Sequence, residues 1–193
     1  ITDRVDRLLG NLEIAERNGA NAVLANALPI GFSALRMLRE HAGVPIISHF
    51  PLYTALSQLP FHGVRECVFT KIIRLCGADG LVYPGFDPRM KTPEEEVLAS
   101  VRVCQEKIGA LKPILPIPAG SESALTLPDR YKRIGSIDFG LGAGRGITSH
   151  PLGPMRGAAS LLQSWQAIQS GSSLEEYAKD HEELRLAIES RRL

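Results

Sequence analysis

Residues 44–49 read Val-Pro-Ile-Ile-Ser-His, a short apolar run that ends on an imidazole side chain. The run does not alternate apolar and polar residues, which is typical of a strand buried on both faces of a parallel sheet. Four more runs share this character, and they span residues 21–28, 80–84, 113–118 and 137–141. Amphipathic stretches at helical spacing separate the runs, so the sequence predicts an α/β fold with parallel strands and right-handed crossovers.

The segments around these runs predict the helices. Residues 92–108 begin Thr-Pro-Glu-Glu-Glu, with Thr92 as the expected cap, Pro93 in the first helical position and acids in the first turn. We expect residues 172–193 to form a helical extension outside the main sheet. The other predicted helices cover residues 5–19, 31–41, 64–75, 154–169 and 174–189.

Two architectures accommodate these elements: an open, doubly wound five-stranded sheet and part of a (β/α)8 barrel. A complete barrel needs eight strands and about 250 residues. This chain has 193 residues and begins on a helix without a strand before it. We therefore expect residues 1–193 to be the later part of a (β/α)8 TIM barrel, with about five βα units followed by C-terminal helices.

The composition argues against several classes of protein. The 22 Lys+Arg residues offset 21 Asp+Glu residues, and no basic run forms a nucleic-acid-binding face. No stretch approaches about 18 uninterrupted apolar residues, so no membrane span is predicted. The cysteines, Cys67, Cys76 and Cys104, lack zinc-site spacing and are too few for a disulfide scaffold. Reduced thiols are the simpler interpretation, and they predict a cytoplasmic protein.

Two glycine-rich segments follow the fourth and fifth predicted strands. They read Ala-Gly-Ser-Glu-Ser at 119–123 and Gly-Ala-Gly-Arg-Gly at 142–146. Glycine lets the backbone approach an anion, and consecutive loops at the end of a barrel form the usual phosphate site of that fold. Arg145 adds a side chain suited to bidentate phosphate contact. A dinucleotide fingerprint does not fit, because residues 142–147 fail G-x-G-x-x-G at the last position. Tight turns alone are the competing explanation.

The ends of the predicted strands supply further candidates, since barrel catalysis occurs at the C-terminal face. His49 ends one strand, where its ring would face the barrel mouth, although a packing histidine fits this position equally well. Residues 84–91 suit either a mobile lid that presents Arg89 or Lys91 to an anionic substrate or a plain surface loop. No pair of acids ends a strand, so the chain encodes no complete magnesium site. The other strand-end candidates are Asn26, Tyr83 and Ser121.

These motifs, in this order, resemble the C-terminal barrel of the RuBisCO large-subunit superfamily. The resemblance is greatest to its RuBisCO-like (form IV) proteins, which do not fix carbon dioxide, and it covers nearly the whole chain. The motifs that carry it are Val-Pro-Ile-Ile-Ser-His-Phe at 44–50, His62-Gly63 followed by Thr-Lys-Ile-Ile-Arg-Leu-Cys-Gly-Ala-Asp at 70–79, Pro-Ile-Pro-Ala-Gly-Ser at 116–121, and Phe-Gly-Leu-Gly-Ala-Gly-Arg-Gly-Ile-Thr-Ser-His-Pro-Leu-Gly-Pro at 139–154.

The resemblance implies that residue 1 follows the third barrel strand. The family's N-terminal α+β domain, first three strands, carbamylated lysine and two acidic magnesium ligands would then lie upstream. It also implies a homodimer, with the active site completed by that upstream part. His49 matches the active-site histidine, and Lys91 matches loosely the catalytic lysine of the mobile sixth loop. The residues that match the site of one substrate phosphate are Gly120, Ser121, Gly144 and Arg145.

Several positions depart from the true carboxylases. Phe50 stands in place of an arginine, Tyr53 and Tyr83 stand in place of histidines, and Ala119 stands in place of a serine. Because such arginine and histidine side chains help to hold a second phosphate, the resemblance implies a monophosphate substrate and no carboxylation. We therefore expect a magnesium-dependent lyase or isomerase that enolises a phosphorylated keto-sugar or sugar acid. The alternatives are a non-catalytic binding or regulatory family member and an unrelated phosphate-binding barrel of the aldolase or isomerase kind.

Overall fold

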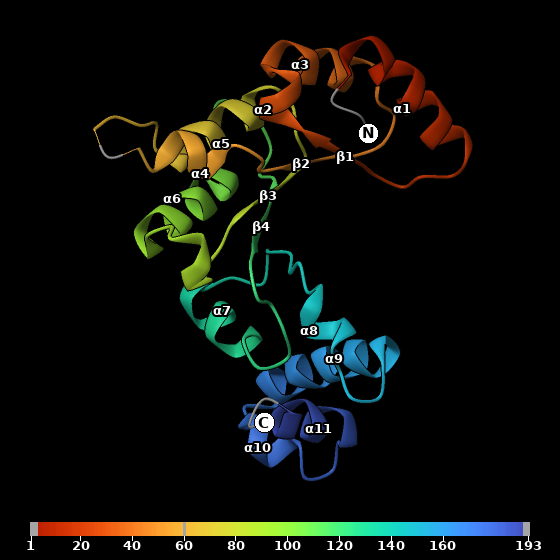
Figure 1. The fold of residues 1–193 in the computed structure, drawn as a ribbon, viewed down its shortest axis with the longest axis vertical. Coiled ribbons are helices and arrows are strands. Elements are labelled where there is room, and N and C mark those ends of the chain that lie inside the picture. Colours follow the sequence, from red (N-terminus) through yellow and green to blue (C-terminus); the bar gives the residue numbers. More distant parts are fainter. Residues whose placement is uncertain (1–3, 60, 191–193) are drawn as a thin grey trace. The chain divides into compact units, whose positions relative to one another are not determined.

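The computed structural model describes residues 4–59 and 61–190. In this part of the chain, four strands form one sheet in chain order: β1 (Val23–Asn26), β2 (Ile46–His49), β3 (Gly80–Pro84) and β4 (Leu115–Ala119). β1 pairs with β2 and β2 pairs with β3 in parallel, as Figure 1 shows. The predicted α/β architecture and the first four predicted strands are confirmed.

The fifth predicted strand, residues 137–141, does not form a regular strand. Residues 138–140 nevertheless run beside β4, because the Gly140 N–H donates to the Pro116 carbonyl oxygen at 2.8 Å. A Cβ at Gly140 would lie 2.8 Å from Ile117 Cγ1, so the backbone approaches β4 closely there. Glycine has low strand propensity, and the glycines at 140, 142 and 144 explain why the ladder does not continue.

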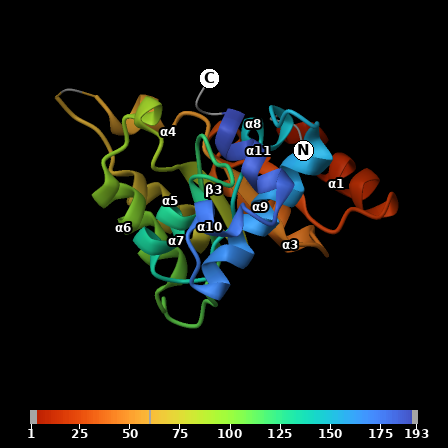
Figure 2. The same cartoon turned by 90° about the horizontal axis from the view of Figure 1, so that it is seen from below.

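The chain forms two compact units, one of residues 1–118 with 138–140 and one of residues 119–137 with 141–193. In the first unit, α5 and α6 pack against each other beside the strands, as Figures 1 and 2 show. The helices of this unit are η1 (Val5–Arg7), α1 (Leu8–Arg17), α2 (Ala27–Ile30), α3 (Phe32–His41), α4 (Tyr53–Ser57), α5 (Glu66–Leu75), η2 (Pro88–Met90) and α6 (Glu94–Gln105). Fully buried side chains of its core include Leu8, Leu35, Leu38, Ile46, Ile73, Leu81 and Val97.

The start of α6 differs from its prediction. The helix begins at Glu94 with Pro93 at the cap position, and no side chain caps it. The Thr92 hydroxyl, the expected cap, instead donates to Glu66 Oε1 at 3.1 Å. The contact with Glu66 holds the Thr92 side chain away from the N–H groups at the start of the helix.

The second unit is helical and is organised around its longest helix, α9 (Pro154–Ser170). α9 contacts the four other helices of the unit: α7 (Leu127–Ile134), α8 (Arg145–Thr148), α10 (Leu174–Tyr177) and α11 (Glu182–Ser190). Figure 2 shows α9 and α11 side by side. The predicted helix of 174–189 is therefore two helices, and both pack on α9.

Small residues make this packing close. The fully or nearly buried positions of α9 are Gly157, Ser160, Ser164 and Ala167. A Cβ at Gly157 would lie only 2.2 Å from the Ile147 carbonyl oxygen, so the start of α9 touches the backbone of α8. The Ser164 hydroxyl donates to the Ala124 carbonyl oxygen at 2.6 Å.

The strand register decides which side chains share a face of the sheet. Ile47 pairs with Gly80, and a Cβ at Gly80 would lie 2.7 Å from Ile47 Cδ1, so the two share one face. Because side chains alternate along a strand, His49 lies on that same face. Tyr83, three residues after Gly80, lies on the opposite face and is fully buried. Tyr83 is near the end of β3, but its side chain is buried on the face opposite to that of His49. It is therefore a poor candidate for a residue at the barrel mouth, where the strand-end candidates are expected.

Burial raises the pKa of Tyr83 well above its ordinary value, and its hydroxyl has no hydrogen-bond partner among the described residues. A buried hydroxyl without a partner carries a desolvation cost, so removing it is neutral or favourable. We predict that Tyr83→Phe leaves the free energy of unfolding unchanged or raises it by up to about 1 kcal/mol. Leu81→Ala, on the same face of β3, should lower it by about 2–5 kcal/mol. Urea unfolding of the intact protein measures both variants. If Tyr83→Phe lowers the free energy of unfolding by more than about 1 kcal/mol, the Tyr83 hydroxyl has a hydrogen-bond partner after all.

Candidate functional site

His49 ends β2, directly opposite Asn26 at the end of β1. Parallel pairing places the carboxyl ends of both strands at one edge of the sheet, as predicted for His49. The His49 ring is half-buried, lies 4.5 Å from the Phe50 ring centroid to centroid, and has its pKa lowered by burial. At neutral pH the imidazole is therefore neutral, so one ring nitrogen can accept a proton while the other donates a hydrogen bond.

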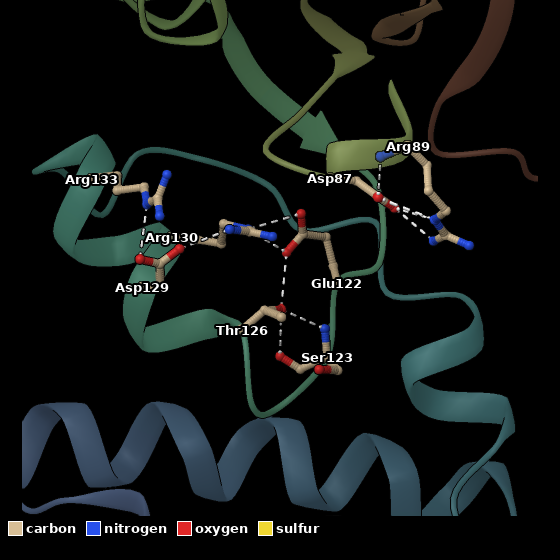
Figure 3. A network of polar contacts seen from close by, with 8 residues as sticks. All are labelled: Asp87, Arg89, Glu122, Ser123, Thr126, Asp129, Arg130 and Arg133. Carbon is tan, nitrogen blue, oxygen red and sulfur yellow. Dashed lines mark hydrogen bonds and ion pairs between the residues drawn. The ribbon is translucent and has the colours of Figure 1, made fainter. Parts of the chain in front are cut away.

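The segment of residues 84–91 contains a cation that is already paired. Asp87, only 4% exposed, caps η2 and accepts from the Arg89 N–H at 2.9 Å. The Arg89 guanidinium returns to the same carboxylate, with Nη2 2.6 Å from Asp87 Oδ2. Figure 3 draws this pair by itself at the 3-10 turn. Arg89, one of the two expected substrate cations, is thus engaged within its own loop.

Lys91, the other expected cation, is exposed and has a left-handed backbone with φ 54°. It lines a pocket of about 560 Å³, which it shares with Ser57 and Glu66. The described lining of this pocket does not include His49. Lys91 and His49, the two predicted catalytic residues, therefore do not share this pocket.

Glu66, in that pocket, is an unusual carboxylate. It is 2% exposed, and its Oε1 accepts from the Ser57 hydroxyl at 3.0 Å and from the Thr92 hydroxyl at 3.1 Å. Its Oε2 has no hydrogen-bond partner in the described residues. Burial raises the pKa of Glu66, and the carboxylate of Glu96 adds to the effect.

The two glycine-rich loops meet in the second unit. Gly120 has φ 134° and Ser121 has φ 53°, so the chain turns through two left-handed residues directly after β4. A Cβ at Gly146 would lie 2.1 Å from the Glu122 carbonyl oxygen and 2.6 Å from Ser123 Cβ. The structure thus brings the segment after β4 into backbone contact with the segment that starts α8.

Packing requires a glycine at Gly146, which is not among the predicted phosphate-binding residues. Gly144, which is among them, has φ −73° and open space within 4 Å of an added Cβ in the described chain. Arg145, at the first position of α8, is exposed. The N–H groups of Arg145 and Gly146 have no acceptor inside the helix, because the first N–H groups of any helix point outward. Four predicted phosphate residues therefore lie on two touching loops, with Gly144 and Arg145 at the open end.

A buried ion pair supports the first of these loops. Glu122 and Arg130 have side chains 0% and 8% exposed, and Arg130 Nε lies 3.0 Å from Glu122 Oε2. The Thr126 hydroxyl donates to Glu122 Oε2 at 3.1 Å, as drawn in Figure 3. No sequence signal indicated this pair, because residues eight apart that lie on a loop and a helix follow no periodic pattern.

His150 holds two backbone groups with its ring nitrogens. Its Nδ1 accepts from the Leu152 N–H at 3.2 Å, which leaves Nε2 to donate to the Glu183 carbonyl oxygen at 2.9 Å. Among the residues that the structure describes, no three His, Cys, Asp or Glu side chains gather as a metal site. Over the same residues, each helix is too short or too polar to cross a bilayer.

Comparison with known proteins finds similarity along nearly the entire chain. A family model described as the ribulose bisphosphate carboxylase large chain, catalytic domain, matches residues 1–191. The chain belongs to this family. In TIM barrels the active sites lie at the carboxyl-terminal edge of the strands, and His49 ends β2 at that edge of its sheet.

RuBisCO-like proteins are prominent among the relatives. The chain is 49% identical to one from Chlorobaculum tepidum over 98% of its own length, and 50% identical to RuBisCO-like protein 2 of Rhodopseudomonas palustris over 97%. It covers 43% and 44% of those proteins, so it spans less than half of their length.

Solved structures of RuBisCO-type proteins confirm the predicted TIM-barrel class. A rubisco-like protein from Burkholderia fungorum superposes with a TM-score of 0.90 at 31% identity. A rubisco-like protein (MtnW) from Alicyclobacillus acidocaldarius gives 0.90 at 29% identity. Each match covers 97% of this chain and 47% of the other.

Glu66 makes the stability of the first unit depend on pH. In the unfolded chain a glutamate ionises near pH ~4.3, whereas burial raises the pKa of Glu66 in the native state. The stabilisation by the protonated form is therefore complete below about pH 4.3 and is lost as the pH rises through the raised native pKa. Glu66→Gln keeps an oxygen for the Ser57 and Thr92 hydroxyls, so we predict a higher free energy of unfolding than the wild type at pH 7 and no gain at pH 4.

Urea unfolding of the intact protein at pH 4, 5, 6 and 7 measures this effect. Glu95→Gln is the matched control, because Glu95 is a solvent-exposed glutamate in the first turn of α6 and the substitution makes the same chemical change. A Glu66→Gln variant that is less stable than the wild type at pH 7 would show that the ionised carboxylate has a favourable partner.

Proposed function

We propose that this chain is the later part of the catalytic barrel of a RuBisCO-like enzyme that enolises a phosphorylated keto-sugar or sugar acid without fixing carbon dioxide. The reaction would be of the lyase or isomerase type, with a small monophosphate as substrate. The observation that carries the proposal is the backbone contact between the two glycine-rich loops at Gly146 and Glu122. That contact gathers all four predicted phosphate-binding residues on neighbouring segments.

In this proposal the anion lies at the open end of the two loops. Backbone N–H groups that converge from a left-handed turn form a concavity suited to an anion, and Ser121 occupies such a turn. The free N–H groups at the start of α8 and the exposed Arg145 guanidinium add donors on the facing loop. Open space at Gly144 leaves the backbone accessible to a phosphate oxygen.

His49 would act on the part of the substrate that loses a proton. A neutral imidazole accepts a proton or holds a hydroxyl group in position, and burial keeps His49 neutral at pH 7. The exposed Lys91, at the end of the segment of residues 84–91, remains a proposed second contact. Its position in a pocket without His49 makes it a weaker candidate for the same step.

The described residues do not fit a magnesium site, because they contain no group of three potential ligands. We propose that its ligands, the carbamylated lysine and two acids of the resemblance, lie upstream of residue 1. We also propose a cytoplasmic homodimer whose upstream part completes the active site. Free Cys67, Cys76 and Cys104 support the reducing compartment.

A second candidate is a family member that binds a phosphorylated ligand without turning it over. It is favoured by the loss of polar side chains at Phe50 and Ala119. The upstream sequence discriminates between the two, since a degenerate protein would lack the lysine and acids of the metal site. Both candidates require the anion site, and only the enzyme requires proton abstraction.

Proton exchange tests the enzymatic proposal directly. We expect the intact protein, with magnesium in deuterated water, to exchange a carbon-bound proton next to the carbonyl of a ketose monophosphate. Proton NMR follows the loss of that signal, and a reaction without protein gives the background rate. Binding of the phosphorylated compound without exchange above background, for all candidates tried, would favour the non-catalytic family member.

Two variants separate phosphate binding from proton transfer. Gly144→Val should weaken affinity for inorganic phosphate at least tenfold by filling the open space over the backbone, and should leave the fold intact because no neighbour lies within 4 Å. His49→Ala should lower the exchange rate by about 10²–10⁴-fold and change phosphate affinity little. Calorimetric titration and the exchange assay measure the two effects. Equal phosphate affinity in Gly144→Val and the wild type would remove the proposed phosphate site.

A further inference from the structure

The buried pair of Glu122 and Arg130 joins the loop that follows β4 to helix α7. Arg130 Nε contacts both carboxylate oxygens of Glu122, at 3.1 Å and 3.0 Å. Its Nη1 donates to Asp129 Oδ2 at 2.8 Å, so its positive charge is compensated on two sides. Figure 3 shows the guanidinium between these two carboxylates. Arg130 is therefore unsuited to bind a substrate anion itself, unlike the exposed Arg145.

Stability alone is a poor explanation for this pair. Burying two charges costs desolvation energy that their attraction often fails to recover, and well-packed apolar residues serve a core at least as well. The better-supported role of a buried ion pair is to select one conformation among several. The conformation at stake here is that of residues 120–126, which connect β4 to α7.

The contacts of Glu122 fix this loop from both sides. Its carboxylate accepts from the Thr126 hydroxyl, and the Thr126 oxygen in turn accepts from the Ser123 N–H at 2.9 Å. These contacts fix the backbone just after Ser121. Ser121 is a non-glycine residue in the unfavourable left-handed region, with φ 53°. The Glu122 carbonyl oxygen is also the atom that a Cβ at Gly146 would meet first, at 2.1 Å. One residue thus anchors the first loop and contacts the second.

We infer that Glu122 and Arg130 are positioning residues that set the spacing between the two anion-binding loops. The inference rests on the proposed function, because it assigns the pair to the same phosphate site. The pair does not touch the anion. It holds the left-handed turn at Ser121 and presses the Glu122 carbonyl against Gly146, so that the donors of both loops face one anion.

Replacing the pair by apolar residues separates positioning from stability. Glu122→Met with Arg130→Met removes both charges together and leaves neither unpaired, so the double variant should melt within a few degrees of the wild type. Its affinity for inorganic phosphate should nevertheless fall at least tenfold, because the Glu122 carboxylate then no longer ties the loop to Thr126 and Arg130. Asp129→Asn is the matched control: it alters the outer, half-exposed partner of Arg130 and should change phosphate affinity less than twofold.

A gentler variant keeps the inference testable if the double variant does not fold. Glu122→Asp preserves the charge but withdraws the carboxylate by one methylene group, so phosphate affinity should fall about three- to tenfold while the melting temperature changes little. Calorimetric titration of the intact protein with inorganic phosphate, beside a melting curve for each variant, gives both readouts.

The outcomes distinguish this inference from the proposed function. Phosphate binding by the wild type that is lost in the folded double variant or in Glu122→Asp, but kept in Asp129→Asn, supports the positioning role. Equal affinity in the wild type and a folded Glu122 variant overturns the positioning role and leaves the phosphate site standing. Absence of phosphate binding to the wild type overturns both.

Discussion

Parallel pairing of β1, β2 and β3 is the constraint on which the first unit depends. Parallel strands cannot be joined by a tight turn, so each connection must cross over the sheet, and helices supply the crossovers. The helices cover one face of the strands, where Ile46 and Leu81 are fully buried, and the apolar run at residues 44–49 supplies such a strand. The same pairing brings the carboxyl ends of β1 and β2 to one edge, where Asn26 and His49 lie opposite each other.

Close backbone contact plays the corresponding part in the second unit. Gly146 and Gly157 both lie where a carbonyl oxygen occupies the space of a Cβ, at 2.1 Å and 2.2 Å. The first contact joins the two glycine-rich loops, and the second joins α8 to α9. Gly144 has no such neighbour in the described chain. Packing therefore accounts for Gly146 of the 142–146 motif and does not account for Gly144.

His49 and Tyr83 lie on opposite faces of the sheet, and this difference separates their roles. His49 shares its face with Ile47 and Gly80, whereas Tyr83 lies on the opposite face beneath the helices. Tyr83 is thus part of the packing layer and offers no phenol to the barrel mouth. The proposal of a monophosphate substrate then depends on Phe50 and Tyr53, which stand in place of an arginine and a histidine of the true carboxylases.

The sequence by itself determined the α/β class, the four strands and the candidates at strand ends and glycine loops, because burial and helical or extended periodicity are local patterns that repeat along the chain. It also carried the resemblance to the RuBisCO family, which the match over residues 1–191 confirmed. The missing fifth strand and the displaced cap at Thr92 show where local pattern lost to tertiary neighbours: Gly140 packs on Ile117, and Thr92 donates to Glu66. Only the tertiary structure decided which glycine is required by packing and which arginine is already neutralised. Both depend on contacts between residues that are not neighbours in the sequence, and such contacts follow no regular spacing along the chain.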